Sequence, residues 1–201
     1  MGFDLYGLKP NNPNNAIKPE QMDWSIKHTR KEKDVYFKAV NDYECEVIGH
    51  YFRNNVWWWR PLWTFVGVAC DDILTEKDIS SGSYNDGHKI CKTKALKIAA
   101  RLRKLNKQGV IDMYEETTMK MVKEAQDINN KLRKDKVALS SIVKKETGND
   151  SIVPMEYPTK YRKKFEAILD KENWSGHYPF YADNVREFST FCQNSGGFEI
   201  C

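Results

Sequence analysis

The pattern of apolar and polar residues predicts one strand at the start of the chain. Residues 2–7 alternate apolar with polar side chains, and this period of two is typical of a half-buried strand. A loop rich in asparagine and proline follows over 10–19. Residues 35–40 fit a short helix or a strand equally well, and both alternatives stay open.

Helical periodicity dominates the rest of the chain. Spacing of apolar residues near 3.6 predicts a helix over 88–106, a second over 112–134 that 137–143 continues after a break, and shorter helices over 161–169 and 185–192. The residues expected on the inner faces are Cys91, Ala95, Ile98, Ala99, Leu102 and Leu105 in the first helix, and Met121, Val122, Ala125, Ile128 and Leu132 in the second.

The end of the sequence is apolar and follows two glycines. Gly196 and Gly197 predict a left-handed end to the last helix. We expect residues 198–201 to pair with the N-terminal strand, because this would hide a strand edge. With no internal repeat and no change of composition, the expected architecture is a single globular domain over 1–201. Its predicted class is mainly α, in an α+β arrangement with a small β element.

Composition narrows the class of protein. The chain is 40% hydrophobic and 30% charged, which suits a globular protein, and its net charge of +4 permits an anionic partner without requiring one. No apolar run reaches the roughly 18–20 residues of a membrane helix, and no secretory signal is present, so we expect a cytoplasmic protein. Five cysteines without a CxxC pair and four histidines without an HExxH motif predict neither disulfides nor a metal or cofactor.

The most unusual segment, 49–63, has four tryptophans within seven positions. A helix here begins near Arg60, or near Asn55 with a kink at Pro61. Consecutive helical residues point about 100° apart, so at least one indole should face away from the core. Nearby arginines and asparagines offer donors for a phosphate beside rings that can stack on a base. The predicted ligand-binding residues are Arg53, Asn54, Asn55, Trp57, Trp58, Trp59, Arg60 and Trp63. Burial of the whole segment in the core is the alternative.

The turn before the helix predicted over 88–106 is a second candidate site. Tyr84, Asn85, Asp86 and His88 could hold an anion together with free backbone N–H groups and the helix dipole, although such turns are also common in ordinary folds. Residues 89–107 hold eight lysines and arginines and no acid, which indicates either contact with a nucleic-acid backbone or a solvated helix face.

Three blocks of the sequence resemble a group of small proteins encoded by tailed bacteriophages that have no assigned activity. The blocks are GFDLYG at 2–7, YFRNNVWWWRPLW at 51–63 and SGGFEIC at 195–201. The resemblance implies a phage accessory protein that acts in the cytoplasm of a bacterial host, where proteins of this size counter host defences or redirect nucleotide metabolism. It implies no catalytic residue.

These observations lead to three hypotheses. In the one that we favour, the tryptophan segment and the turn that follows bind and sequester a nucleotide-like anionic small molecule. The second hypothesis is an enzyme acting on a nucleotide-type substrate, with His50, His88 or Asp86 as general acid or base. The third is an interaction or structural subunit, such as a homo-oligomer, anchored by the indoles and Arg60. Nucleic acid is a less favoured partner, and no membrane partner is expected.

Overall fold

The computed structural model describes residues 2–201 and confirms the predicted class. The protein is 61% helical with a small antiparallel sheet of four strands. Its internal contacts divide the chain into two compact units. The sheet unit comprises Met1–Met113 and Tyr181–Cys201, and the hairpin unit comprises Tyr114–Phe180. The single domain over 1–201 stays a prediction.

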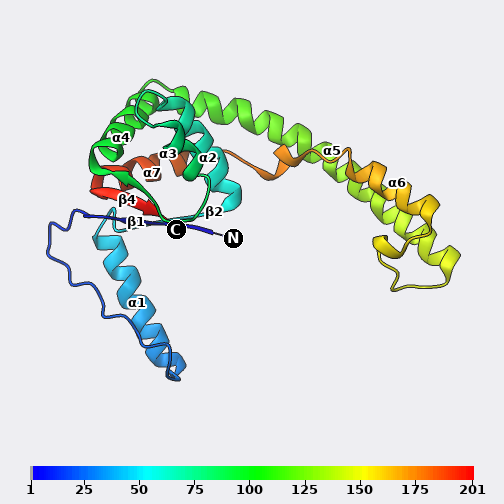
Figure 1. The fold of residues 1–201 in the computed structure, drawn as a ribbon, viewed down its shortest axis with the longest axis horizontal. Coiled ribbons are helices and arrows are strands. Elements are labelled where there is room, and N and C mark those ends of the chain that lie inside the picture. Colours follow the sequence, from blue (N-terminus) through cyan, green and yellow to red (C-terminus); the bar gives the residue numbers. More distant parts are fainter. Residues whose placement is uncertain (1) are drawn as a thin grey trace. The chain divides into compact units, whose positions relative to one another are not determined.

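The sheet places the first and last strands of the chain side by side (Figure 1). The strands are β1 (Gly2–Gly7), β2 (Tyr51–Asn55), β3 (His88–Cys91) and β4 (Gly197–Ile200). Their order in space is β2-β1-β4-β3, and all neighbours are antiparallel. The ends of the chain therefore form the centre of the sheet.

The pairing of β1 with β4 confirms the predicted contact between the N-terminal strand and the apolar tail. Leu5 lies opposite Ile200, and both side chains are fully buried. Next to them, the backbones of Asp4 and Cys201 exchange two hydrogen bonds of 2.8 Å. Gly196 has a φ of 65°, which is the left-handed helix end that the sequence predicts.

Helices α2 (Val56–Ala69), α4 (Lys92–Lys107) and α7 (Ala182–Asn194) cover one face of the sheet (Figure 1). The fully buried Phe188 of α7 is surrounded by aromatic rings. These rings belong to Phe52, Trp59, Trp63, Phe191 and Phe198. An aromatic core thus joins two of the covering helices to the sheet.

The predicted start of the helix over 88–106 is wrong. Residues 88–91 form β3 instead, because their backbone pairs with β4 and Ile90 is buried against the sheet unit's core. The helix begins at Lys92, and Cys91 is its exposed N-cap residue, not an inward-facing one.

The segment over 35–40 belongs to a helix, α1 (Arg30–Glu46). Thr29 and Glu32 form a capping box at its start, in which each side chain bonds the backbone N–H of the other. None of the residues of α1 is buried.

The hairpin unit is formed by most of α5 (Val110–Thr147), by α6 (Thr159–Leu169) and by two short 3-10 turns, Pro154–Glu156 and Trp174–His177. The core between α5 and α6 contains buried Leu139, Val143, Tyr157 and Tyr161. No helix among residues 2–201 combines the length and apolar character that crossing a membrane requires.

Two expectations for α5 are wrong. The helix continues without a break between 134 and 137, because exposed charged residues do not interrupt helical hydrogen bonding. Met121 and Ile128 were expected on the inner face but are 61% and 44% exposed. Within the helix predicted over 112–134 the buried stripe is narrow, because only Val122, Ala125 and Leu132 of the expected residues are buried.

Candidate functional site

The tryptophan segment lies at the entrance to α2, as the sequence predicts. Of the two starts considered, the structure shows the earlier one, with Asn55 as N-cap and Pro61 inside the helix. The Asn55 side chain accepts a hydrogen bond of 3.0 Å from the backbone N–H of Trp58. Strand β2 therefore leads directly into α2, and the sheet fixes the first turn of the helix.

The four indoles divide into a buried pair and an exposed pair. Trp59 and Trp63 are 0% and 2% exposed, and their rings stack at 5.2 Å. Trp59 also stacks on Phe3 of β1. Trp57 and Trp58 remain 41% and 45% exposed. This confirms that at least one indole faces away from the core, and it places the other two in the packing of the sheet unit.

The buried indoles form hydrogen bonds with α3 (Glu76–Ser81) and with the residue that follows it. Trp59 donates its indole N–H to the carbonyl of Gly82, and Trp63 donates to that of Ile79, both at 2.9 Å. A Cβ at Gly82 would lie 2.3 Å from the Trp63 ring, so this close approach requires glycine. The tryptophan segment is therefore bonded to the residues just before the predicted turn, and the buried indole N–H groups are used within the protein.

Residues from both segments border one end of β1. Asn85 donates a hydrogen bond of 3.3 Å to the carbonyl of Gly2. Gly2 pairs with Asn55, the residue that caps the helix carrying Trp58. Arg53 approaches the same point, since its guanidinium would lie 3.9 Å from a Cβ at Gly2. We call Arg53, Asn55, Trp58 and Asn85 the sheet-end cluster.

Arg53 carries the positive charge of the sheet-end cluster. Its Nε lies 3.5 Å from Oδ1 of Asp4, and its side chain remains 69% exposed. Tyr51 donates a hydrogen bond to the same carboxylate. Burial raises the pKa of Tyr51, and the bond to Asp4 raises it further, so the phenol keeps its proton at neutral pH. Asp4 thus orients the Arg53 guanidinium from one side, and the group remains largely exposed to solvent.

Asn54 has a structural contact that sequence reasoning did not foresee. It is 3% exposed and donates a hydrogen bond of 2.9 Å to Asn184 of α7. Asn184 in turn donates to the carbonyl of Trp58 at 3.4 Å, and the Trp58 ring packs edge-on against Tyr181. Asn54 therefore helps to position Trp58. Arg60, like Trp57, lies on the exposed side of α2.

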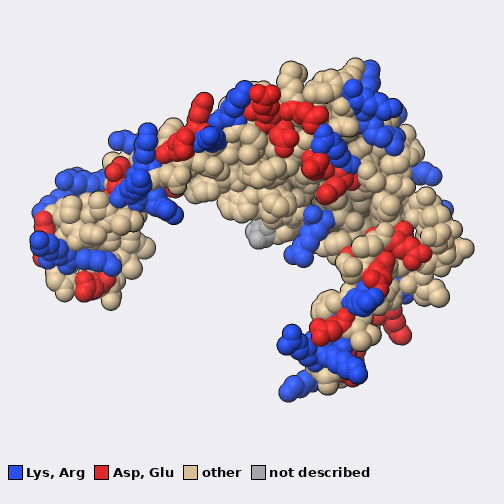
Figure 2. Space-filling model, turned by 180° about the vertical axis from the view of Figure 1, so that it is seen from behind, with Lys and Arg blue, Asp and Glu red and all other residues tan. Residues whose placement is uncertain are grey.

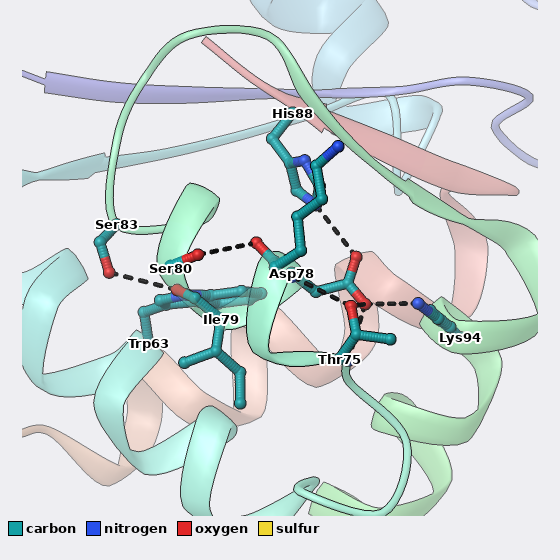
Figure 3. Close-up of polar contacts among 9 residues, drawn as sticks. Trp63, Thr75, Asp78, Ile79, Ser80, Ser83, His88 and Lys94 are labelled. Carbon is teal, nitrogen blue, oxygen red and sulfur yellow. Dashed lines mark hydrogen bonds and ion pairs between the residues drawn. The ribbon is translucent and has the colours of Figure 1, made fainter.

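A buried network around Asp78 holds the predicted site residue His88 (Figure 3). Asp78 accepts hydrogen bonds from the N–H and hydroxyl of Thr75 at 2.8 and 2.7 Å, contacts His88 Nε2 at 3.0 Å, and pairs with Lys94. Burial favours the neutral acid, but the bonds from Lys94, Thr75 and His88 outweigh it and hold the pKa of Asp78 well below its ordinary value. The network joins α3, β3 and α4.

Asp78 was not among the predicted residues, although the sequence carries a signal for it. Thr75 and Asp78 have the spacing of a capping box, and both reciprocal hydrogen bonds are present at the start of α3. His88 is only 14% exposed and faces this carboxylate. Its position favours a structural role over contact with an anion.

The remaining turn residues are exposed. Tyr84 keeps 65% of its surface, and Asp86 also faces solvent. The turn is anchored at its far end, where the N–H of Gly87 bonds the carbonyl of Ile200 at 2.8 Å. The turn is thus held at Gly82 and at Gly87, and Tyr84 lies between them, next to Asn85 of the sheet-end cluster.

The basic stretch over 89–107 is partly neutralised by other elements. Four of its side chains have acceptors outside the stretch, and these pairs are Lys89 with Glu199, Lys94 with Asp78, Arg101 with Asp72, and Arg103 with Gln193. These contacts favour a helix face that binds its own surroundings over a continuous surface for a nucleic-acid backbone.

A polar groove of about 480 Å³ lies beside the start of α4. Lys9 and Lys92 line it, no acidic residue does, and neither lysine forms an ion pair with any described residue. Its carboxamides are partly engaged, since Gln193 accepts a hydrogen bond from Arg103. The groove has no aromatic lining residue, so it offers charge to an anion but no ring for a base to stack on.

The other groups considered for chemistry are held by packing. The His50 ring lies edge-on to Tyr43, and burial lowers the pKa of His50. Burial raises the pKa of Cys70 to about 11 and that of Cys192 well above its ordinary value, so both thiols stay protonated at neutral pH. Among residues 2–201, no cluster of three His, Cys, Asp or Glu side chains is arranged to hold a metal ion.

Comparison of the chain with protein-family profiles, with curated protein sequences and with solved structures found no match.

Proposed function

We propose that this chain is a binding protein for a nucleotide-like anionic small molecule, which it holds at the sheet-end cluster. The resemblance to phage proteins supports placing this activity in the cytoplasm of a bacterial host, where binding would sequester a host signalling molecule. The predicted pocket changes: Trp59 and Trp63 support the site from the core, Asn54 and His88 are held by contacts within the protein, and Trp58 supplies the ring that a ligand would meet.

The observation that supports this proposal is that Arg53 and Asn85 both lie beside Gly2 at one end of β1, and that Trp58 follows in the first turn of the helix that Asn55 caps there. Trp58 is fixed by the Asn55 cap, Asn85 by Gly2, and Arg53 by Asp4. Groups held in this way lose little freedom when a ligand binds, which favours affinity.

The three groups suit different parts of a nucleotide. An indole face can stack on a base, a guanidinium can bind phosphate oxygens through two parallel N–H donors, and a carboxamide can both donate and accept hydrogen bonds at a base edge or a sugar. The Asp4 carboxylate beside Arg53 reduces the attraction for an anion, so the stacking ring matters more here than in a site made of charges alone.

The first test identifies what the protein retains from a cell. Whole protein purified from bacteria is denatured, and the released small molecules are analysed by mass spectrometry beside a Trp58→Ala/Arg53→Ala variant. We expect a nucleotide in the wild-type extract and its absence from the variant. Calorimetry with that compound should then show that Trp58→Ala weakens binding by about 5- to 150-fold, which corresponds to the loss of about 1–3 kcal/mol of stacking per base.

Two control variants make the result specific. Trp174→Ala removes an indole of the hairpin unit that is 63% exposed, against 45% for Trp58, and should leave binding unchanged. Lys92→Ala tests the polar groove, and binding that depends on Lys92 but not on Trp58 would overturn the proposed location. An empty extract, together with no heat of binding across cyclic and linear nucleotides, would reject the function itself. A stable oligomer that Trp58→Ala dissociates would then favour the third hypothesis, a protein interface.

A further inference from the structure

Helix α1 and the segment leading into it carry much exposed apolar surface. None of the 17 residues of α1 is buried. Val35 is 63% exposed and Phe37 55%, and before the helix Trp24 and Ile26 are 50% and 60% exposed. Burial of a large apolar side chain gains about 1.5–3 kcal/mol, so this surface would be stabilised by a partner.

Local contacts occupy the side of α1 that carries Phe37 and leave the side of Val35 open, because helical residues two positions apart point about 200° apart. The Trp24 ring packs against the rings of Tyr36 and Phe37 at 6.0 and 5.9 Å, and the Thr29–Glu32 capping box fixes the first turn. An isolated helix of this length is marginal in water, and most helices gain their stability from packing an apolar face. The segment that precedes α1 does not cover that face.

A groove of about 430 Å³ runs beside the exposed Val35. Its lining residues are Met22, His28, Lys31, Glu32, Val35 and Tyr36. The groove joins the segment before α1 to the first half of the helix, and it lies on the same side of α1 as the exposed line described next.

One exposed line along α1 changes in character from end to end. Lys31, Val35, Ala39, Asp42 and Glu46 follow each other at spacings of three or four and are all exposed, so they share one face of the helix. This face is basic at Lys31, apolar at Val35 and Ala39, and acidic at Asp42 and Glu46, and Lys38 on the same face pairs with Asp42 at 2.6 Å within the helix. In Figure 2, Lys and Arg predominate at the outer end of α1, and acidic side chains with basic ones among them lie nearer the sheet.

We propose that this face of α1 is the docking surface for α1 of a second copy of the chain, arranged antiparallel about a two-fold axis. Antiparallel pairing places the basic start of one helix beside the acidic end of the other. It also sets the larger Val35 against the smaller Ala39. The face is therefore complementary to itself, as a two-fold interface requires.

The size of the surface predicts a reversible dimer. A helix of 17 residues is about 25 Å long. One helix pair with its flanking segments lies near or below the roughly 1,200 Å² at which standard stable interfaces begin. We therefore expect dissociation constants in the range of about 1–100 micromolar.

Sedimentation velocity of the whole protein, from about 1 to 200 micromolar, tests the dimer. The wild type should shift from monomer to dimer across this range. Val35→Asp places two like charges at the centre of the interface and should raise the dissociation constant at least about tenfold. Val68→Asp is the matched control, because Val68 is 75% exposed on α2, outside the proposed surface, and should leave the dimer unchanged.

A charge exchange tests the antiparallel arrangement. Lys31→Glu should weaken the dimer, and Lys31→Glu combined with Glu46→Lys should restore it, since opposite charges then face each other again. Glu46 is chosen because Asp42 pairs with Lys38 within the helix. Circular dichroism of each variant shows whether α1 is still helical. A wild type that stays monomeric throughout, a dimer insensitive to Val35→Asp, or a double variant no tighter than the single one would overturn the proposal.

Discussion

Helices α1 and α2 both carry aromatic runs, yet α2 packs into the core and α1 does not. In α2 the buried residues are Trp59, Leu62, Trp63, Phe65, Val66 and Gly67, whereas α1 has none. The surroundings account for the difference: α2 contacts the sheet, α3, α4 and α7, but α1 packs its rings against the segment that precedes it. Apolar content alone does not decide burial, because the elements that surround a helix decide which of its side chains are covered.

The largest effect should come from the buried indole of α2. Trp59→Ala removes the stacks on Phe3 and Trp63 together with the hydrogen bond to Gly82, and should lower the free energy of unfolding by about 3–5 kcal/mol. In α1, Val35→Ala should change it by less than about 0.5 kcal/mol. Urea denaturation of both variants measures the contrast, and equal losses would contradict it.

A smaller loss is expected when the network that joins α3 to β3 and α4 is broken. Asp78→Asn should lower the free energy of unfolding by about 2–3 kcal/mol at neutral pH, because charged hydrogen bonds from Lys94 and His88 are lost. The folded-state pKa of Asp78 is depressed, so its contribution is complete above the unfolded pKa of about 4 and declines at lower pH. The difference in free energy of unfolding between wild type and variant, measured by urea denaturation, should therefore become smaller on acidification. A difference that grows would show that the carboxylate is not stabilised as described.

The smallest expected losses of stability come from removing the N-cap residues of α2 and α1. Asn55→Ala removes the cap of α2 and should lower the free energy of unfolding by about 1 kcal/mol. Thr29→Ala removes the capping box of α1, but should change global stability by less than about 0.5 kcal/mol, because α1 can fray without exposing a core. Hydrogen exchange of the α1 amides should accelerate in the Thr29 variant alone. A global loss from Thr29→Ala would mean that α1 is coupled to the core.

The strand pairing at the chain ends could be predicted because both segments carry their own signal. Residues 2–7 alternate, and 198–201 follow a glycine pair and are apolar. Strands β2 and β3 have no such signal. Only Asn54 of β2 is buried, and β3 contributes a single buried side chain, Ile90. Cys91 fits a helical spacing with Ala95, so the local pattern predicts a helix that starts within β3. Pairing with a strand more than 100 residues away decided the outcome.

The candidate site was predicted in its segments but not in its detail. The sequence identifies both the tryptophan run and the turn near Asn85, and the structure brings them together. Which indoles are buried depends on the start of α2, and Asn55 or Arg60 were equally good starts from local rules. The role of Asn54 depends on Asn184, which is 130 positions away along the chain and beyond the reach of any local pattern.

The central position of β4 has a consequence for protein synthesis. Strand β1 leaves the ribosome early, but its neighbour β4 begins 190 positions after β1 ends, at Gly197 against Gly7. At 5–20 residues per second, β1 waits roughly 10–40 s for this partner. During that time only β2 is available on one of its edges, and the apolar Phe3 and Leu5 are without their final neighbours. A nascent chain interrupted before residue 197 cannot complete the sheet, so chaperones and proteases would meet such a fragment with its central strand edge open.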